Sequence, residues 1–99
     1  MKGLIIEEQV CDSALNLTHG FTYPVKRIVI PEADNLAITP HGDELYVFAG
    51  FKFRNGCKTL GEIEVPDELV KEAQMFMQAK AKFVGLKDQF EALIAQVVQ

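Results

Sequence analysis

The chain has 99 residues, a length that suits one small domain. Hydrophobic residues make up 48% of it and charged residues 24%, with a mean hydropathy of +0.08, which excludes an intrinsically disordered chain. Ten lysines and arginines against fourteen acidic residues give a net charge of −4. A general nucleic-acid-binding protein normally carries a basic excess, so we expect no direct binding to nucleic acid.

Cysteine content and the N-terminal sequence favour a cytoplasmic protein. Cys11 and Cys57 lack CxxC spacing and are too few for a disulfide scaffold, which favours reduced thiols. No window reaches the ~18 consecutive apolar residues of a membrane span. Glu7 and Glu8 come too early for the apolar core of a signal peptide. We therefore expect no contact with a membrane.

The first two thirds of the chain predict an antiparallel β-meander. Runs of β-branched and aromatic residues alternate with turn-forming segments such as Pro31–Asn35 and Pro40–Asp43. Together with a helix that follows, the pattern predicts an α+β fold in one domain over residues 1–99, with a sheet over 1–65. The five to six predicted strands cover residues 3–10, 15–22, 25–30, 36–39, 45–54 and 57–65.

Asn55-Gly56 is the strongest turn signal in the chain. This pair favours a type I′ turn, which needs positive φ at both central residues and joins two strands in a tight hairpin. Such a hairpin would pair residues 45–54 with 57–65 and place Gly50 opposite Gly61, leaving a notch in one face of the sheet. The side chains predicted around the notch are Tyr46, Phe48, Lys52, Arg54, Thr59 and Ile63.

The predicted notch combines an apolar wall with cationic and hydroxyl groups. This chemistry suits a small anionic ligand with a flat ring, such as a nucleotide. The alternative is that Gly50 and Gly61 mark a bend or the close approach of another backbone, for instance where a helix crosses. Phenylalanines and cations also alternate over residues 51–58, which resembles a base-stacking platform or, alternatively, an ordinary hairpin tip with its phenylalanines inside.

From Pro66 to about residue 98 the sequence predicts one long amphipathic helix. Pro66 suits the first turn, and Asp67 and Glu68 favour the positive end of the helix dipole. Apolar residues recur every seven positions in a coiled-coil-like pattern, with a second row over Ala79, Leu86 and Leu93 that has Glu72 as its polar member. The predicted interface residues are Leu69, Phe76, Phe83, Leu86, Phe90, Leu93 and Val97.

A helix of this length predicts self-association. It would measure roughly 50 Å, whereas a small meander is only about 20 Å along its strands. The sheet could not cover the whole helix, so we expect its C-terminal half to pack on another subunit in a homodimer or a larger assembly. The alternative is a kink or break near Gly85, giving two antiparallel pieces that pack on the chain's own sheet.

The sequence holds no motif that points to catalysis, a cofactor or a metal. His41 lies two residues from Asp43, but Pro40–Asp43 consists of ordinary turn-forming residues. His19, His41 and the two cysteines lack the spacing of metal ligands. No phosphate-binding loop, dinucleotide fingerprint or nucleophile elbow is present.

Three functions from different classes remain. The first is a non-catalytic, homo-oligomeric binding protein that sequesters a small anionic ligand. Its size and lack of motifs are also typical of accessory proteins of phages and mobile elements, an analogy of architecture alone. The second is a protein–protein inhibitor or adaptor, with dispersed acidic pairs that could mimic nucleic acid. The third is a small enzyme at a dimer interface that uses His41 or Tyr46.

Overall fold

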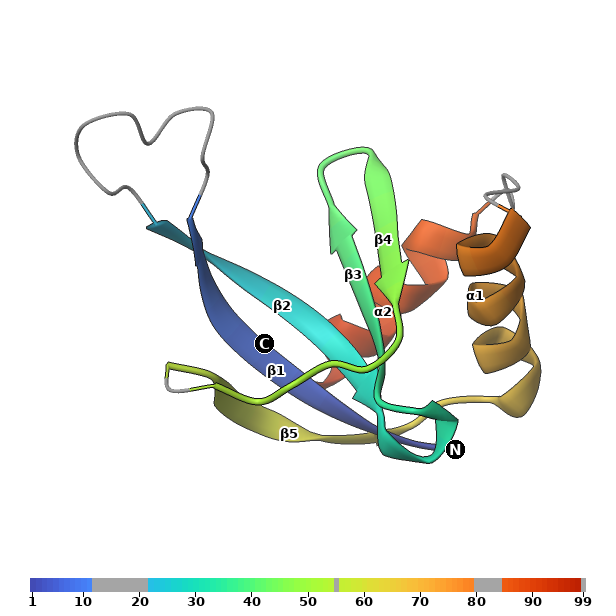
Figure 1. Ribbon diagram of the computed structural model, residues 1–99, viewed down its shortest axis with the longest axis horizontal. Coiled ribbons are helices and arrows are strands. Elements are labelled where there is room, and N and C mark those ends of the chain that lie inside the picture. The colour runs from blue at the N-terminus through green and yellow to red at the C-terminus, as the bar shows by residue number, and fades with distance from the viewer. Residues whose placement is uncertain (12–21, 55, 80–84, 99) are drawn as a thin grey trace.

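The computed structural model describes residues 1–11, 22–54, 56–79 and 85–98. An α+β fold is confirmed, with an antiparallel sheet followed by helices (Figure 1). The strand predicted over residues 15–22 lies almost wholly outside the described residues. The elements are β1 (Lys2–Cys11), β2 (Thr22–Ile30), the 3-10 helix η1 (Pro31–Ala33), β3 (Leu36–His41), β4 (Glu44–Phe48), β5 (Lys58–Glu64), α1 (Asp67–Ala79) and α2 (Leu86–Val97).

The five described strands form one sheet in the order β4-β3-β2-β1-β5. The predicted hairpin pairing is wrong, because β5 pairs with β1 and lies at the opposite edge from β4. Strand β4 ends at Phe48, and the described residues that follow, 49–54 and 56–57, here called the crossing segment, pass over the face of the sheet to the other edge (Figure 1). Gly50 and Gly61 therefore do not face each other, and the predicted notch does not form.

Local geometry explains this difference. Gly50 has φ +74°, a left-handed conformation that ends the extended run. A tight turn does occur where the sequence predicted it, since the Cys57 N–H donates to the Arg54 carbonyl at 3.1 Å. Asn55 itself lies outside the described residues. The turn signal therefore reports a reversal of the chain but not which strand pairs with which.

The sheet is apolar on both faces. One face packs against the helices, and its buried residues include Ile5, Ile28, Ile30 and Ile38. The other face, here called the open face, carries a smaller buried cluster of Ile6, Val29 and Ala37, covered by Phe51 of the crossing segment. Each face therefore has a cover of its own.

The prediction of one long helix is wrong. Helix α1 ends at Ala79 and α2 begins at Leu86, preceded by Gly85 at φ +79°. This corresponds to the alternative in which the helix breaks near Gly85. The break lets α2 run back behind the sheet (Figure 1), so the apolar stripe is buried without a second subunit.

The side chains of the predicted helix interface pack within the chain itself. Leu69, Leu86 and Phe90 belong to the buried core. Phe76, Leu93 and Val97 are partly buried against the same core, and Phe83 lies outside the described residues. The described part of this stripe therefore packs on the chain's own core instead of being free for a second subunit, and self-association itself stays a prediction.

Gly61 marks the place where α2 lies closest to β5. A Cβ atom at Gly61 would lie 2.6 Å from Cγ1 of Val97, closer than real Cβ contacts. The helix therefore approaches Gly61 through the Val97 side chain, which fits the alternative of a crossing helix at this glycine.

Replacing Gly61 by valine should push α2 away from β5. We expect Gly61→Val to lower the free energy of unfolding by about 1–3 kcal/mol, the usual cost of overpacking. Urea denaturation measures this loss. Adding Val97→Ala, which removes the obstructing methyl groups, should recover part of it relative to Val97→Ala alone. A Gly61→Val chain as stable as the original would contradict the packing argument.

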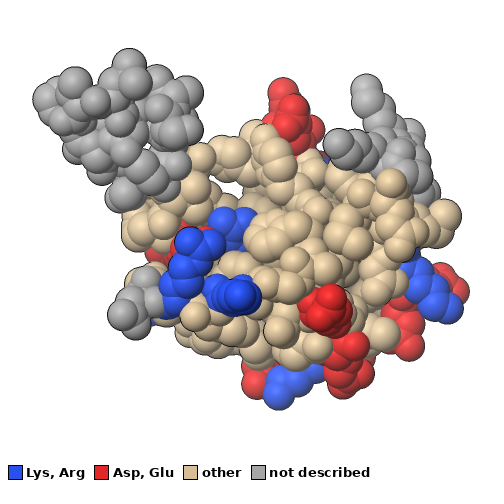
Figure 2. All heavy atoms as spheres, viewed as in Figure 1, with Lys and Arg blue, Asp and Glu red and all other residues tan. Residues whose placement is uncertain are grey.

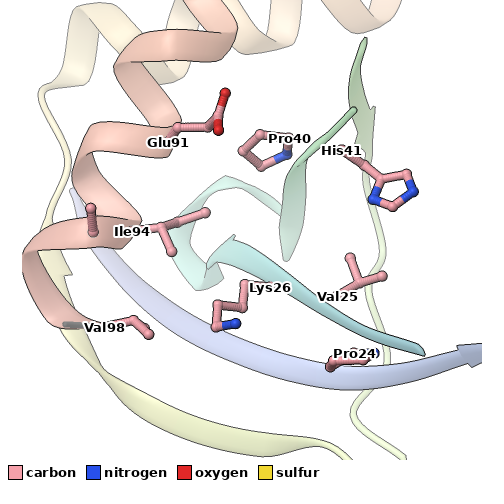
Figure 3. A pocket seen from close by; sticks show the side chains of 9 residues that line it. Pro24, Val25, Lys26, Pro40, His41, Glu91, Ile94 and Val98 are labelled. Atoms are coloured by element: carbon pink, nitrogen blue, oxygen red, sulfur yellow. The ribbon is translucent and has the colours of Figure 1, made fainter. Parts of the chain in front are cut away.

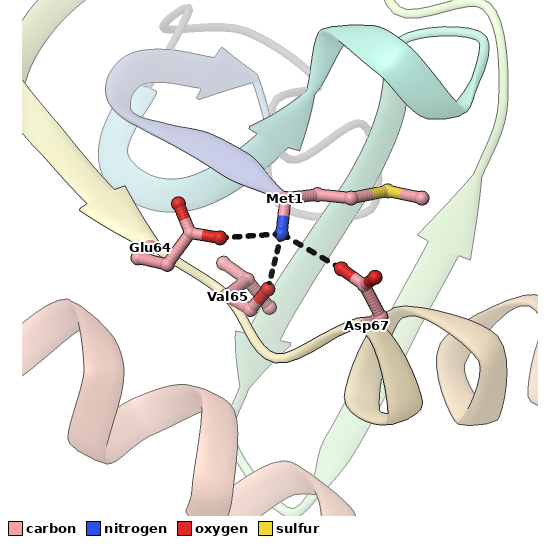
Figure 4. Close-up of polar contacts among 4 residues, drawn as sticks. All are labelled: Met1, Glu64, Val65 and Asp67. Atoms are coloured by element: carbon pink, nitrogen blue, oxygen red, sulfur yellow. Dashed lines mark hydrogen bonds and ion pairs between the residues drawn. The ribbon is translucent and has the colours of Figure 1, made fainter.

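The N-terminal amino group joins β1 to the connection between β5 and α1. It donates to Oε1 of Glu64 at 2.7 Å, to the Val65 carbonyl at 2.6 Å and to Oδ1 of Asp67 at 3.0 Å (Figure 4). The hydrogen bond to Glu64, followed by that to Asp67, raises the pKa of this amine above its ordinary value of 8.0. The charged amine therefore links β1 to Glu64 at the end of β5 and to Asp67 at the start of α1.

This raised pKa predicts a loss of stability at alkaline pH. The contribution of the amine is fully present below its ordinary pKa of 8.0 and is lost as the pH rises through the raised folded value. We expect the double variant Glu64→Gln/Asp67→Asn to be less stable than the original chain below pH 8.0. The difference between the two free energies of unfolding, measured by urea denaturation, should become smaller above that pH. A difference that stays constant across the alkaline range would show that the amine contributes nothing.

Candidate functional site

The open face of the sheet exposes an unusual set of large aromatic side chains. Tyr46 and Phe48 point to the same side of β4, because they lie two residues apart, and are 48% and 41% exposed. Phe53 of the crossing segment is 50% exposed. Exposed aromatic groups that gather on one face are typical of a binding surface.

The crossing segment is anchored so that its aromatic residues lie over the sheet. The Gly50 N–H donates to the Asp34 carbonyl at 2.8 Å, and the Phe51 N–H donates to the Asn35 carbonyl at 3.0 Å. Phe51 is 3% exposed and fills the apolar cluster beneath it. These two hydrogen bonds hold the start of the segment beside the residues that precede β3.

Three phenylalanines form a continuous row on this face. The ring centroids of Phe48 and Phe51 are 6.1 Å apart, and those of Phe51 and Phe53 are 5.2 Å apart and perpendicular. The guanidinium carbon of Arg27 lies 5.8 Å from the Phe48 centroid and 5.9 Å from that of Phe51. A cation thus lies against two rings of the row, within cation–π range.

Arg27 is also the centre of a partly buried polar network. Its Nη1 donates to Oγ1 of Thr39 at 2.8 Å, and its Nη2 donates to Oε1 of Glu8 at 3.0 Å. The Cys57 thiol donates to the other Glu8 oxygen at 3.1 Å. The Arg27 and Glu8 side chains are only 12% and 13% exposed. The network therefore attaches the far end of the crossing segment to β1 and β2.

Opposing effects set the pKa of Glu8. Burial raises it, but hydrogen bonds from Cys57 and Arg27, together with the charges of Arg27 and Arg54, outweigh burial and leave the pKa below its ordinary value of 4.5. Glu8 therefore stays ionised at neutral pH, and its charge offsets that of Arg27.

The structure brings Tyr46, Phe48, Lys52 and Arg54 to this face. Tyr46 and Phe48 come from β4, and Lys52 and Arg54 come from the crossing segment, where both are exposed. Figure 2, viewed from this side, shows lysine and arginine side chains gathered where the crossing segment passes over β1 and β2, next to a broad uncharged surface.

The three remaining predicted ligand-binding residues are Thr59, Gly50 and Gly61. Thr59 is exposed in the edge strand β5 and lies opposite Ile6, so it is also on the open face. Gly50 begins the crossing segment, and Gly61 faces α2 on the helix side of the sheet. Tyr46, Phe48, Lys52 and Arg54 therefore share the open face because of the crossing segment and not because of a hairpin.

Sequence reasoning missed Arg27 and Glu8 as parts of this surface. Val25, Arg27 and Val29 fall on one face of a predicted strand, so a charge interrupts an otherwise apolar row. A charged residue in that position usually needs a partner, and Glu8 at the end of the first apolar run was available. That interruption was the signal that could have found the pair.

The groups considered for catalysis have structural partners. The His41 ring stacks on that of Tyr23, with centroids 5.3 Å apart. The Tyr46 hydroxyl donates to Oε2 of Glu44 at 2.6 Å, a bond that raises the pKa of Tyr46. His19 lies outside the described residues. Over the part of the chain that the structure describes, no group of three or more His, Cys, Asp or Glu side chains could hold a metal ion.

Comparison with known proteins gives no relative. The chain matches no protein-family model, and no curated protein and no solved structure is significantly similar to it. Neither of the two described helices, α1 and α2, is long and apolar enough to cross a membrane.

The lowered pKa of Glu8 predicts acid sensitivity. The stability that Glu8 contributes is present above its ordinary pKa of 4.5 and is lost as the pH falls through the lower folded value. We expect Glu8→Gln to flatten the decline of the unfolding free energy below pH 4.5, measured by urea denaturation. Glu32→Gln, at an exposed position, is the control and should leave the decline unchanged. An equally steep decline in Glu8→Gln would argue against the network.

Proposed function

We propose that this chain is a non-catalytic binding protein whose open face holds a small anionic ligand with a flat ring, such as a nucleotide. The observation that carries the proposal is the row Phe48, Phe51 and Phe53 with the Arg27 guanidinium against it. Exposed cations, Lys52 and Arg54, come from the same crossing segment.

The two kinds of side chain match the two parts of such a ligand. Stacking of a base on an exposed aromatic ring contributes roughly 1–3 kcal/mol and tolerates any base. Lys52 and Arg54 can neutralise a phosphate, since both side chains are exposed and lie on either side of Phe53 in the sequence. The overall charge of −4 favours a small ligand over a long nucleic acid.

A monomer fits this proposal as well as a homodimer does. The helix stripe that suggested assembly is packed in the chain's own core. The exposed rings of Tyr46, Phe48 and Phe53 could instead contact a second copy, and sedimentation of the full chain with and without a nucleotide distinguishes these cases. A role as an accessory protein of a phage or mobile element stays a prediction.

Nucleotide binding should stabilise the folded chain. A ligand present at a hundredfold excess over its dissociation constant adds about 2.7 kcal/mol, so AMP, GMP and cyclic AMP at millimolar concentration should raise the thermal midpoint. We expect Phe48→Ala or Lys52→Ala to weaken binding about tenfold, in line with the loss of one stacking or charge contact. Titration calorimetry measures the affinity.

Lys71→Ala is the matched control, because Lys71 is equally exposed but lies on α1. It should bind each nucleotide as the original chain does. No shift with any of the three nucleotides, or equal affinities for all variants, would rule out the open face as a nucleotide site. Conversion of the nucleotide during the titration, followed by chromatography, would instead favour an enzyme.

A further inference from the structure

A fork opens inside the sheet between β2 and β3. Their ladder has only three pairs, from Ile28 opposite Ile38 to Ile30 opposite Leu36. Beyond it, β2 stays paired with β1 out to Thr22 and β3 stays paired with β4 out to His41. The two strands therefore diverge (Figure 1), and each presents an edge without a ladder partner to the other.

Helix α2 closes the back of this fork. A cavity of about 330 Å³ lies between the two strands and the helix, near the lower end of the ~300–1,000 Å³ typical of small ligand sites. Figure 3 shows the side chains of Lys26 and Ile94 between β2 and α2. Its wall includes Val25 and Lys26 from β2, Ile94 from α2, and Val98 directly after α2.

The cavity offers three kinds of contact at once. Val25, Ile94 and Val98 supply an apolar surface. Lys26 is half-buried and forms no ion pair within the described part of the chain, whereas Glu91, the acid in the wall, is already paired with Lys87. The diverging strand edges supply peptide groups that can pair with an added amide.

The shape of the fork favours a chain end over a continuous strand. Its inner end is closed by the pair Ile28 and Ile38. Near its outer end the rings of Tyr23 and His41 stack with centroids 5.3 Å apart, from one strand to the other. A strand running through the fork would have to pass both of these ends, whereas a chain terminus has to enter at only one point.

We propose that the fork binds the C-terminal residue of an extended peptide. The terminal carboxylate pairs with Lys26, the last amide pairs with the open edge of β2, and an apolar side chain packs on Ile94 and Val98. The partner is therefore a protein with an accessible, apolar C-terminus. This gives the adaptor hypothesis a specific site that does not depend on the open face.

Four ligands test the roles of the carboxylate, the last amide and the preceding residues. Titration calorimetry of the full chain would use the acetylated peptide Ala-Thr-Ala-Val-Leu with a free carboxylate, the same peptide as a C-terminal amide, the same peptide N-methylated at its last residue, and N-acetyl-leucine. We expect the amide and the N-methyl peptide each to bind at least about tenfold more weakly, as each loses a hydrogen bond in the fork. N-acetyl-leucine should also bind at least about tenfold more weakly, as it lacks the preceding residues.

Variants of the chain test whether the peptide binds in the fork. Lys26→Met should weaken the free-carboxylate peptide about tenfold and leave the amide peptide unaffected, because only the charge pair is removed. Lys71→Met, at an exposed position on α1, should leave the affinities for both peptides unchanged. Phe48→Ala should also leave both peptide affinities unchanged, which distinguishes this site from the proposed nucleotide site. Hydrogen exchange should slow at residues 25–27 when the peptide is bound.

Each contrary result overturns the proposal. No binding of the free-carboxylate peptide at millimolar concentration removes the site. If the amide peptide binds as tightly as the free-carboxylate peptide, the carboxylate is not recognised. If the N-methyl peptide binds as tightly as the free-carboxylate peptide, the last amide does not pair with the strand edge. N-acetyl-leucine binding as tightly as the peptide would identify the ligand as a small acyl amino acid and not a protein terminus.

Discussion

The need to cover both faces of one sheet determines the rest of this structure. Apolar residues lie on both sides, with Ile5 and Ile28 on one and Ile6 and Val29 on the other. Burial of an aliphatic side chain contributes roughly 1.5–3 kcal/mol, so neither side can be left in water. The two helices cover one side. The crossing segment covers the other, which explains why β4 and β5 lie at opposite edges.

Most of the strands and the start of the first helix could be predicted from local patterns, because strand alternation and helix-start residues act over a few positions; the end of β4 and the division into two helices were not predicted. Pro66 and Asp67 marked the start of α1, and Asn55-Gly56 marked a reversal of the chain. The strand order could not be predicted, because β5 pairs with β1, whose residues lie about fifty to sixty positions away in the sequence. For the same reason, the heptad pattern could not show whether Phe90 packs on its own sheet or on another subunit.

Four residues of the candidate surface were named from the sequence, but its construction was not. Tyr46, Phe48, Lys52 and Arg54 were expected together on a hairpin, and they share the open face because a non-strand segment passes over the sheet. The crossing segment combines a structural and a binding role: Phe51 fills the core, and its neighbours remain exposed. A ligand on this surface would therefore contact residues whose positions depend on the Arg27, Glu8 and Cys57 network.

The pairing of the first strand with the last has a consequence for how the chain folds. Lys2 lies opposite Glu64, and β1 sits between β2 and β5, so the sheet gains its fifth strand only after most of the chain has been synthesised. Contacts this distant in sequence require closure of a long loop, and domains rich in them fold slowly. Until β5 arrives, one edge of β1 stays open to pairing with other chains. The nascent protein thus passes through a period in which aggregation competes with folding.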